Sequence, residues 1–189
     1  AVAEAIARLT GTLEQVPPAY SAKRVGGRRA YEAARDGVVM ELEPSRVEVF
    51  EWRDVSREGT TLRATISCGG GTYIRALARD LGRLTGSAAH LGALRRVRSG
   101  PFRVADAVTV DALRNGQATV RPALDALPSI PHVSLEGEEA ERVFRGIGVT
   151  RAGDAPSAAL VDNRSGALVA YAEGVGAIWQ PRVVMRKVG

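Results

Sequence analysis

The 189-residue sequence is poor in the residues that build disulfide frameworks and metal sites. It has one cysteine, Cys68, and two histidines, so an intrachain disulfide is excluded and no metal-ligand spacing is present. No apolar run approaches the roughly 20 residues that a membrane-spanning helix needs, and no signal-peptide pattern opens the chain. We therefore expect a cytoplasmic protein of one or two domains that binds neither a metal nor a membrane.

Lysine is also scarce, since Lys23 and Lys187 are the only lysines, so arginine supplies most of the positive charge. The net charge is +5. The basic residues are concentrated in the middle of the chain, where residues 63–103 hold eight arginines and one acidic residue. Residues 36–62, in contrast, hold three basic and seven acidic residues. A local basic block is the electrostatic footprint of a polyanion-binding protein. We favour nucleic acid over the alternative, a solvated arginine-rich face.

A glycine-rich turn at residues 69–71 lies inside this basic block and is followed by Thr72, Tyr73 and Arg75. Glycine lets the backbone approach a ligand closely. A tyrosine ring and a guanidinium two residues apart offer a stacking face and a cation, which suit a nucleobase and a carboxylate or phosphate. The residues alone leave a second interpretation equally open, which is a strand-to-helix turn with a buried tyrosine.

Two strands and a helix are predicted around this turn. Apolar and polar residues alternate over 62–68, and a similar segment precedes them, which predicts an antiparallel hairpin. After the turn, an apolar stripe recurs at helical spacing over 74–84, with Arg75, Arg79 and Arg83 on another face. These like charges predict an offsetting anion, a role for Arg75 in a site, or three solvated arginines. The stripe consists of Ile74, Leu77, Ala78, Leu81 and Leu84.

The end of the chain predicts a separate small domain. Prolines mark a boundary, and we expect domains at 1–128 and 129–189. In the second domain, Ser134 is expected to cap a helix, and residues 158–161 and 167–172 are expected to form a β-hairpin. The predicted fold class is α+β, with a mixed or antiparallel sheet domain followed by a small β-barrel.

Two clusters of cations are the predicted phosphate contacts. The first follows a rigid diproline and Tyr20, and the second follows His90 in a further element that is expected to begin at Gly86. His90 itself is expected to be a packed or hydrogen-bonded histidine rather than a catalyst. The predicted RNA-binding residues are Lys23, Arg24, Arg28, Arg95, Arg96 and Arg98.

Several motifs stand at fixed spacing between residues 15 and 108. They are Gln15-Val16-Pro17-Pro18-Ala19-Tyr20-Ser21-Ala22, Gly27-Arg28, Tyr31-Glu32, Ala34-Arg35, Cys68, Gly71-Thr72-Tyr73-Ile74-Arg75, Asp80-Leu81-Gly82, Ala89-His90, Leu94-Arg95-Arg96, Gly100-Pro101-Phe102 and Asp106-Ala107-Val108. In residues and spacing, these motifs resemble the bacterial tRNA pseudouridine synthase B family. Residues 129–189 loosely resemble the PUA-like RNA-binding domain of that family.

The resemblance implies an isomerase without a cofactor that acts on the T-loop uridine at position 55 of tRNA. Such enzymes flip the base out of its loop, detach the uracil, rotate it and rejoin it through carbon. By motif position, Tyr20 would contact the flipped base and Tyr73 would pack in the active site. Arg75 would pair with a catalytic aspartate, and Leu94 would line the pocket. The implied partner is the tRNA T-arm, and we expect a monomer.

The sequence also departs from the family pattern. The catalytic aspartate of the family belongs to a motif upstream of the region that this chain matches. The chain opens at Ala1 as if within a helix, so we expect that a preceding segment carrying this aspartate is missing and that the chain alone is inactive. Lys23 and Arg24 replace an apolar residue and a lysine of the family pattern. The aspartates that match non-catalytic positions are Asp36, Asp54, Asp80 and Asp106.

Two functions of different classes follow from these observations. The first is a tRNA uridine isomerase, which predicts an upstream segment in the gene. The second is a module that binds structured RNA without modifying it, which predicts a start codon near Ala1. An unrelated basic α+β protein is a third and disfavoured interpretation.

Overall fold

The computed structural model covers the whole chain and describes residues 1–21, 23–25, 28–38, 42–151 and 153–185. The chain forms two compact units, residues 1–94 and 95–189, and each has its own core. Within the described ranges, every helix is too short or too polar to cross a bilayer. The domain boundary predicted after residue 128 stays a prediction.

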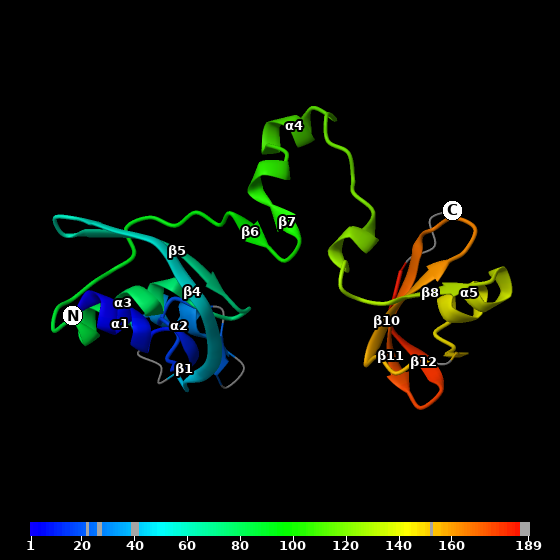
Figure 1. Cartoon of the computed structure of the whole chain (residues 1–189), viewed down its shortest axis with the longest axis horizontal. Coiled ribbons are helices and arrows are strands. Elements are labelled where there is room, and N and C mark those ends of the chain that lie inside the picture. The colour runs from blue at the N-terminus through cyan, green and yellow to red at the C-terminus, as the bar shows by residue number, and fades with distance from the viewer. Residues whose placement is uncertain (22, 26–27, 39–41, 152, 186–189) are drawn as a thin grey trace. The chain divides into compact units, whose positions relative to one another are not determined.

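Unit 1 is organised on a three-stranded antiparallel sheet with the order β1-β4-β5 (Figure 1). The predicted hairpin is confirmed, because β4 and β5 pair with each other across a tight turn. The elements of unit 1 are α1 (Val2–Arg8), β1 (Gly11–Gln15), β2 (Arg24–Val25), β3 (Arg28–Arg29), α2 (Ala30–Arg35), β4 (Ser45–Glu58), β5 (Thr61–Cys68) and α3 (Ile74–Leu84).

Helices α1 and α3 share a core with the sheet of unit 1. Val49 of β4 and Leu77 of α3 are almost fully buried there. A buried leucine contributes roughly 1.5–3 kcal/mol relative to an exposed one. The Trp52 indole N–H also donates a 3.2 Å hydrogen bond to the carbonyl of Leu9, which ties β4 to the end of α1. Packing against the sheet and α1 therefore holds α3 in a defined place.

Helix α3 is buried on two sides. Its predicted apolar stripe packs in the core, with Leu77 and Leu81 buried. On another side, the chain crosses Gly82 so closely that a Cβ there would lie 2.4 Å from the backbone nitrogen of Ala89. The prediction of a further regular element after Gly86 is wrong, because this stretch is an irregular loop that packs on the helix instead.

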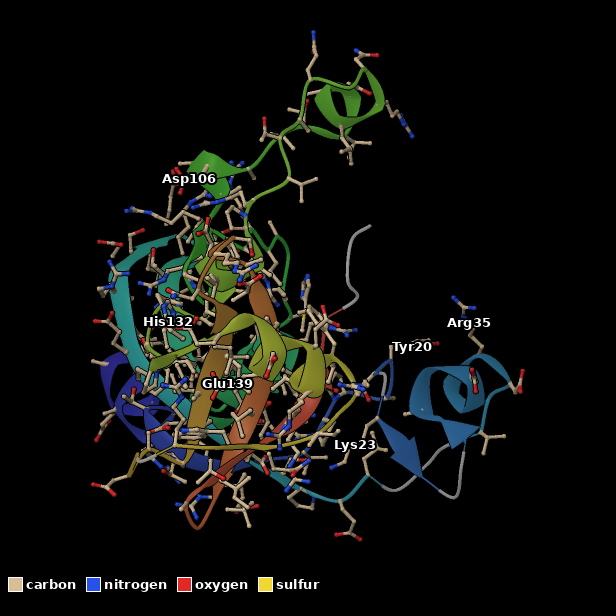
Figure 2. The ribbon with its side chains drawn as sticks, turned by 90° about the vertical axis from the view of Figure 1, so that its right-hand side faces the viewer. Tyr20, Lys23, Arg35, Asp106, His132 and Glu139 are labelled. Carbon is tan, nitrogen blue, oxygen red and sulfur yellow. The ribbon has the colours of Figure 1, made fainter. Side chains whose placement is uncertain are left out.

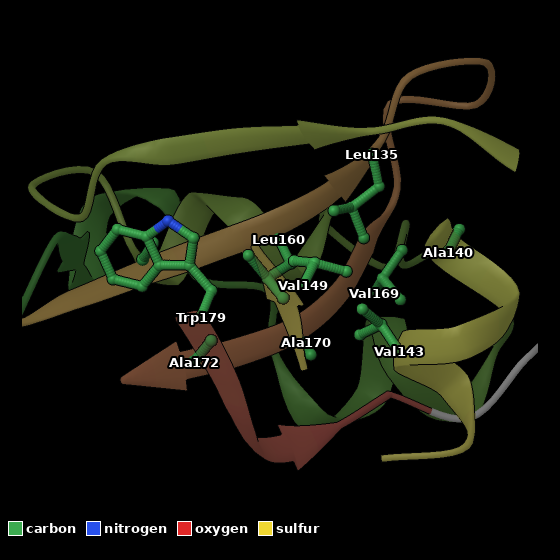
Figure 3. Packing of buried hydrophobic residues seen from close by; sticks show 10 residues of the cluster. Leu135, Ala140, Val143, Val149, Leu160, Val169, Ala170, Ala172 and Trp179 are labelled. Atoms are coloured by element: carbon green, nitrogen blue, oxygen red, sulfur yellow. The ribbon is translucent and has the colours of Figure 1, made fainter. Parts of the chain in front are cut away.

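Unit 2 contains a five-stranded sheet with the order β8-β10-β11-β12-β9. Strands β8 and β10 run parallel, the other neighbours run antiparallel, and α5 packs against the sheet through Ala140 and Val143 (Figure 3). Trp179 fills one end of this core and is 2% exposed. The elements of unit 2 are β6 (Arg98–Ser99), β7 (Phe102–Arg103), α4 (Val110–Arg114), β8 (His132–Leu135), α5 (Gly137–Phe144), β9 (Val149–Thr150), β10 (Ser157–Asp162), β11 (Leu168–Val175), β12 (Ile178–Val184) and 3₁₀ turns at Val104–Asp106 and Ala123–Ala126.

The structure corrects one prediction in unit 2 and confirms two. Ser134 does not cap a helix, because it lies in β8 and pairs in parallel with β10. Helix α5 begins later, with Glu136 as its N-cap residue and Glu139 closing a capping box, so two carboxylates take the place of the expected hydroxyl. The hairpin predicted over 158–172 is confirmed as β10 and β11, and the predicted α+β fold class is confirmed as well.

Candidate active site

The loop that carries Tyr20 and the turn that carries Tyr73 are brought together in unit 1. Gln15, the last residue of β1, is 3% exposed and contacts the Tyr73 backbone twice. Its Nε2 donates to the Tyr73 carbonyl at 3.2 Å, and its Oε1 accepts from the Tyr73 N–H at 2.8 Å. Tyr73 is the N-cap residue of α3, so this pair of hydrogen bonds fixes the start of the helix.

Arg75 reaches the same loop from the first turn of α3. Its Nη2 donates a 2.7 Å hydrogen bond to the backbone carbonyl of Tyr20. Tyr20 is 57% exposed, and its side chain projects from its loop (Figure 2). The predicted site residues Tyr20, Tyr73 and Arg75 therefore lie at one place in the fold, although the first is 55 residues from the last.

The row of arginines on α3 has an acidic partner within the helix. Arg79 binds the Asp80 carboxylate through Nε at 2.8 Å and Nη2 at 2.9 Å, and Arg83 lies 3.5 Å from the same carboxylate. The Arg79 Nη2 also donates to the carbonyl of Val16 at 2.9 Å. Asp80 is thus the offsetting anion that the like charges predicted, and Arg75 is the member of the row that contacts the Tyr20 loop.

A cavity of about 360 Å³ lies beside Arg75 and combines cations with an apolar wall. Such a lining suits a group that has both an apolar face and a negative charge, as a nucleotide has. Leu94, the predicted pocket residue, is 64% exposed and is not part of this lining. The lining residues are Pro18, Ala19, Arg75, Arg79, Ala89, His90 and Leu91.

Two buried hydroxyl groups stand next to the tyrosines of the site. Ser21 is 3% exposed and follows Tyr20, and Thr72 precedes Tyr73. Among the described residues, neither hydroxyl oxygen has a hydrogen-bond partner. A buried polar atom without a partner costs about 1–3 kcal/mol, so each such atom needs an explanation. The two hydroxyls add polar groups to a place that already holds two tyrosines and an arginine.

The first predicted cluster of RNA-binding cations includes a lysine that is held by the fold. The Lys23 Nζ donates to the carbonyl of Glu43 at 2.8 Å and to the Ser45 hydroxyl. These bonds anchor the loop after Tyr20 and engage part of the ammonium group. Strands β2 and β3 place Arg24 and Arg28 on neighbouring backbone segments, but their side chains lie outside the described part of the chain.

The second predicted cluster lies in unit 2. Arg95 and Arg96 are exposed, and Arg98 donates from Nε to the carbonyl of Gly100 at 2.8 Å in the β6-β7 turn. Arg95 and Arg96 are therefore the more accessible members for a phosphate. Tyr20, Tyr73 and Arg75 belong to unit 1.

The sequence did not single out Gln15 or Asp80 as parts of the site. Gln15 gives one weak signal, a polar residue at the end of a strand and two positions before a diproline. Its contact with Tyr73 spans 58 residues, so no local pattern could show it. Asp80 stands alone among eight arginines of its block, and this acidic exception could have identified it as their partner.

Solved structures define the class of fold. The chain aligns over 97% of its length, with a TM-score of 0.68 and 19% identity, to 60% of a chain in the crystal structure of a Cbf5-Nop10-Gar1 complex. It aligns over 98% of its length, with a TM-score of 0.70 and 17% identity, to 61% of a chain in an H/ACA RNP bound to a substrate RNA containing 2′-deoxyuridine. The chain therefore shares its fold with a chain in each of these two complexes.

Sequence comparisons define the family. Residues 1–74 match the TruB family pseudouridylate synthase N-terminal domain, and residues 75–127 match the tRNA pseudouridylate synthase B C-terminal domain. The tRNA pseudouridine synthase B of Symbiobacterium thermophilum is 46% identical over 77% of the chain and 50% of its own length. That of Bradyrhizobium diazoefficiens is 40% identical over 97% of the chain and 58% of its own length. The chain belongs to the TruB family of pseudouridylate synthases, which are isomerases, and spans roughly half the length of these relatives.

Proposed function

We propose that this chain is part of a tRNA pseudouridine synthase that isomerises the T-loop uridine at position 55. The observation that carries the proposal is the meeting of Tyr20, Tyr73 and Arg75 in a chain of the TruB family. In the reaction, the bond from the ribose C1′ to the uracil N1 breaks and a bond from C1′ to C5 forms. The proton leaves C5 and N1 gains one, so neither a cofactor nor a redox step is needed.

The exposed ring of Tyr20 contacts the flipped base in this proposal, and Tyr73 packs beside it. Flipping costs a few kcal/mol of unstacking, which contacts with aromatic rings offset. Leu94 also supplies an apolar contact to the base in this proposal, although it is not among the residues that line the cavity. Tyr20 is the residue best placed for a stacking role, because it is 57% exposed while Arg75 holds its backbone.

Arg75 keeps a catalytic carboxylate ionised in this proposal. An opposite charge within about 4–6 Å lowers a carboxylate pKa. A guanidinium has five N–H donors, and the bond to Tyr20 uses one of them, so others can pair with a carboxylate. In the part of the chain that the structure describes, no ion pair joins Arg75 to an acidic residue, and Asp80 is bound to Arg79. The proposed partner is an aspartate outside this chain, and the chain alone is then inactive.

The cations bind the phosphates of the tRNA T-arm in this proposal. Arg95 and Arg96 are exposed, so we expect them to make the strongest contacts. Further phosphate contacts come from Arg98 nearby in the sequence and from the earlier cluster of Lys23, Arg24 and Arg28. The boundary after residue 128 separates a catalytic domain from a PUA-like RNA-binding domain at 129–189. The protein acts as a cytoplasmic monomer.

The alternative function is a module that binds structured RNA without modifying it. The basic block and the exposed Arg95 and Arg96 favour it, since they require no catalytic carboxylate. It has the same RNA partner, so an assay of chemistry rather than of binding must separate the two functions.

The test compares the 189-residue chain with a chimera that adds the N-terminal part of the Symbiobacterium thermophilum relative ahead of the matched region. Both are incubated with T-arm RNA that carries 5-tritiated uridine, and release of tritium reports the loss of the C5 proton. We expect release by the chimera and none by the chain. Release by the chain alone would contradict the missing carboxylate, and RNA binding without release by either protein would favour the binding module.

A further inference from the structure

Gln15 makes an unusual contact for a side chain, because both ends of its amide bind one backbone residue. The donor and the acceptor of the amide match the N–H and carbonyl of Tyr73, at 2.8 Å and 3.2 Å, in the way two peptide groups pair between strands. Gln15 is also one of two buried polar residues in the described core, the other being Ser21. A buried amide of this kind is stable only while both hydrogen bonds are made.

The contact closes a ring of bonded segments around the site. From Gln15, the chain runs through Pro17 and Pro18 to Tyr20, and the Tyr20 carbonyl accepts from Arg75. Arg75 lies two residues after Tyr73, in the first turn of α3, and Tyr73 returns to Gln15. Each corner of the ring therefore depends on the others for its position.

The diproline makes one side of this ring stiff. Proline fixes its own φ and has no N–H, so residues 17 and 18 cannot donate hydrogen bonds. The loop is anchored through carbonyl oxygens instead, Val16 by Arg79 and Tyr20 by Arg75. Because α3 supplies both donors, the place where α3 begins decides whether the two arginines reach the loop.

From these contacts, the geometry points to Gln15 as a positioning residue of the reaction. It holds the backbone of Tyr73, and through the first turn of α3 it sets the Arg75 guanidinium relative to Tyr20. This inference rests on the proposed function, since it assumes that Tyr20, Tyr73 and Arg75 face the substrate. Gln15 itself is buried and touches neither the base nor the ribose in this assignment.

The substitution Gln15→Glu tests the donor half of the pair. An ionised glutamate still accepts from the Tyr73 N–H but cannot donate to the Tyr73 carbonyl, whereas a protonated glutamic acid can do both. Burial disfavours the charged carboxylate and raises its pKa. We therefore expect the variant to be slow at high pH and to regain rate as the pH falls, relative to the wild-type enzyme at each pH.

The activity measurement uses single turnover of the chimera at saturating T-arm RNA. We expect Gln15→Leu to lower the rate constant by about 10- to 100-fold, the effect of a displacement near 1 Å, with RNA affinity changed less than about twofold. The control is Trp52→Phe, which removes another hydrogen bond between segments of the same core. Trp52 is not part of the ring of bonded segments that links Gln15, Tyr20, Arg75 and Tyr73. Trp52→Phe should leave the rate constant unchanged at a temperature where all variants are folded.

A second measurement needs no activity and uses the 189-residue chain. Amide hydrogen exchange should show Tyr73 N–H protected in the wild type and in Trp52→Phe, and exposed to exchange in Gln15→Leu. Equal rates for wild type and Gln15→Leu, or a Gln15→Glu enzyme with no pH-dependent recovery, would overturn the positioning role. A wild-type chimera without activity would overturn the proposed function and the catalytic part of this inference, while the Tyr73 exchange rate would still decide the contact.

Discussion

The Arg75 guanidinium donates a 2.7 Å hydrogen bond to the backbone carbonyl of Tyr20, 55 residues earlier in the chain. This bond joins a helix to a diproline loop and leaves the Tyr20 ring exposed. The partner is a neutral dipole, so the positive charge of Arg75 is not cancelled by it. One side chain thus anchors the loop and, among the residues that the structure describes, forms no ion pair.

Replacing Arg75 by lysine should separate these roles. A lysine presents a point charge that cannot hold the Tyr20 carbonyl and a carboxylate in the fixed geometry of a guanidinium fork. We expect Arg75→Lys to lower the single-turnover rate constant of the chimera by about 10- to 100-fold, with a much smaller change in RNA affinity. Arg83→Lys is the matched control on the same helix. An unaltered rate constant in Arg75→Lys would show that Arg75 has no catalytic partner.

Neutralising Arg95 and Arg96 should weaken RNA binding through its salt dependence. For B-DNA, each phosphate contact contributes about 0.9 to the magnitude of the slope of log K against log salt concentration, and we apply the same value to duplex RNA. The magnitude of the slope should therefore fall by about 1.8 in the variant in which both arginines are replaced by glutamine. Titrations of T-arm RNA at several salt concentrations measure the slope. The control is Arg53→Gln with Arg57→Gln, and an equal slope in both double variants would remove Arg95 and Arg96 from the phosphate contacts.

Gly82→Ala should destabilise unit 1. The new Cβ would lie 2.4 Å from the backbone nitrogen of Ala89, and a backbone atom cannot move aside as a flexible side chain can. Overpacking of this kind costs about 1–3 kcal/mol in the free energy of unfolding. Gly92→Ala is the control, because its Cβ would meet nothing within 4 Å, and its change should stay within about 0.5 kcal/mol. Urea unfolding of the 189-residue chain checks both, and equal midpoints would contradict the close approach.

Glu139→Gln should make the stability of unit 2 less sensitive to acid. The hydrogen bond from the Glu136 backbone, followed by the hydrogen bond and charge of Arg151, lowers the pKa of Glu139 below its ordinary value of 4.5. A carboxylate with a lowered folded-state pKa stabilises the fold above its unfolded pKa, and this contribution is lost as the pH falls through the folded pKa. The amide oxygen of the variant can still accept from the Glu136 N–H, so at neutral pH it should lose only the charge contribution at the start of α5, about 0.3–1 kcal/mol of unfolding free energy.

The measurement is thermal or urea unfolding of both proteins from pH 7 down to pH 3. The difference between wild type and Glu139→Gln should shrink as the pH drops below 4.5. A difference that stays constant across this range would show that the Glu139 charge does not contribute to the stability of unit 2.

Local patterns predicted the elements of this protein better than they predicted its contacts. The alternation over 62–68 and the stripe over 74–84 are short-range patterns, and both elements formed as expected. Ser134 was misjudged because hydroxyl residues suit helix caps and strand ends alike, and the parallel pairing with β10 decided the outcome. Whether a residue touches another 58 positions away depends on how the sheet and α3 pack, which no window of sequence contains.

The candidate site was predictable in the same partial way. The resemblance placed Tyr20, Tyr73 and Arg75 in one site, and the structure brings these residues together. The resemblance gave no role to Gln15, because the role of a buried amide can be inferred only when the backbone groups that it binds are known. Leu94, Arg95 and Arg96 are exposed, and their roles stay predictions.

The pairing of Arg79 with Asp80 changes how the charge of α3 is felt from outside. Counting residues gives that helix three cations and one anion, spread along its length. The anion lies against Arg79 and near Arg83, so its screening falls on the middle and end of the helix, and within the described ranges Arg75 at the first turn has no acidic partner. An approaching polyanion is therefore attracted toward the N-terminal end of α3, where the partial positive charge of the helix dipole adds to the charge of Arg75.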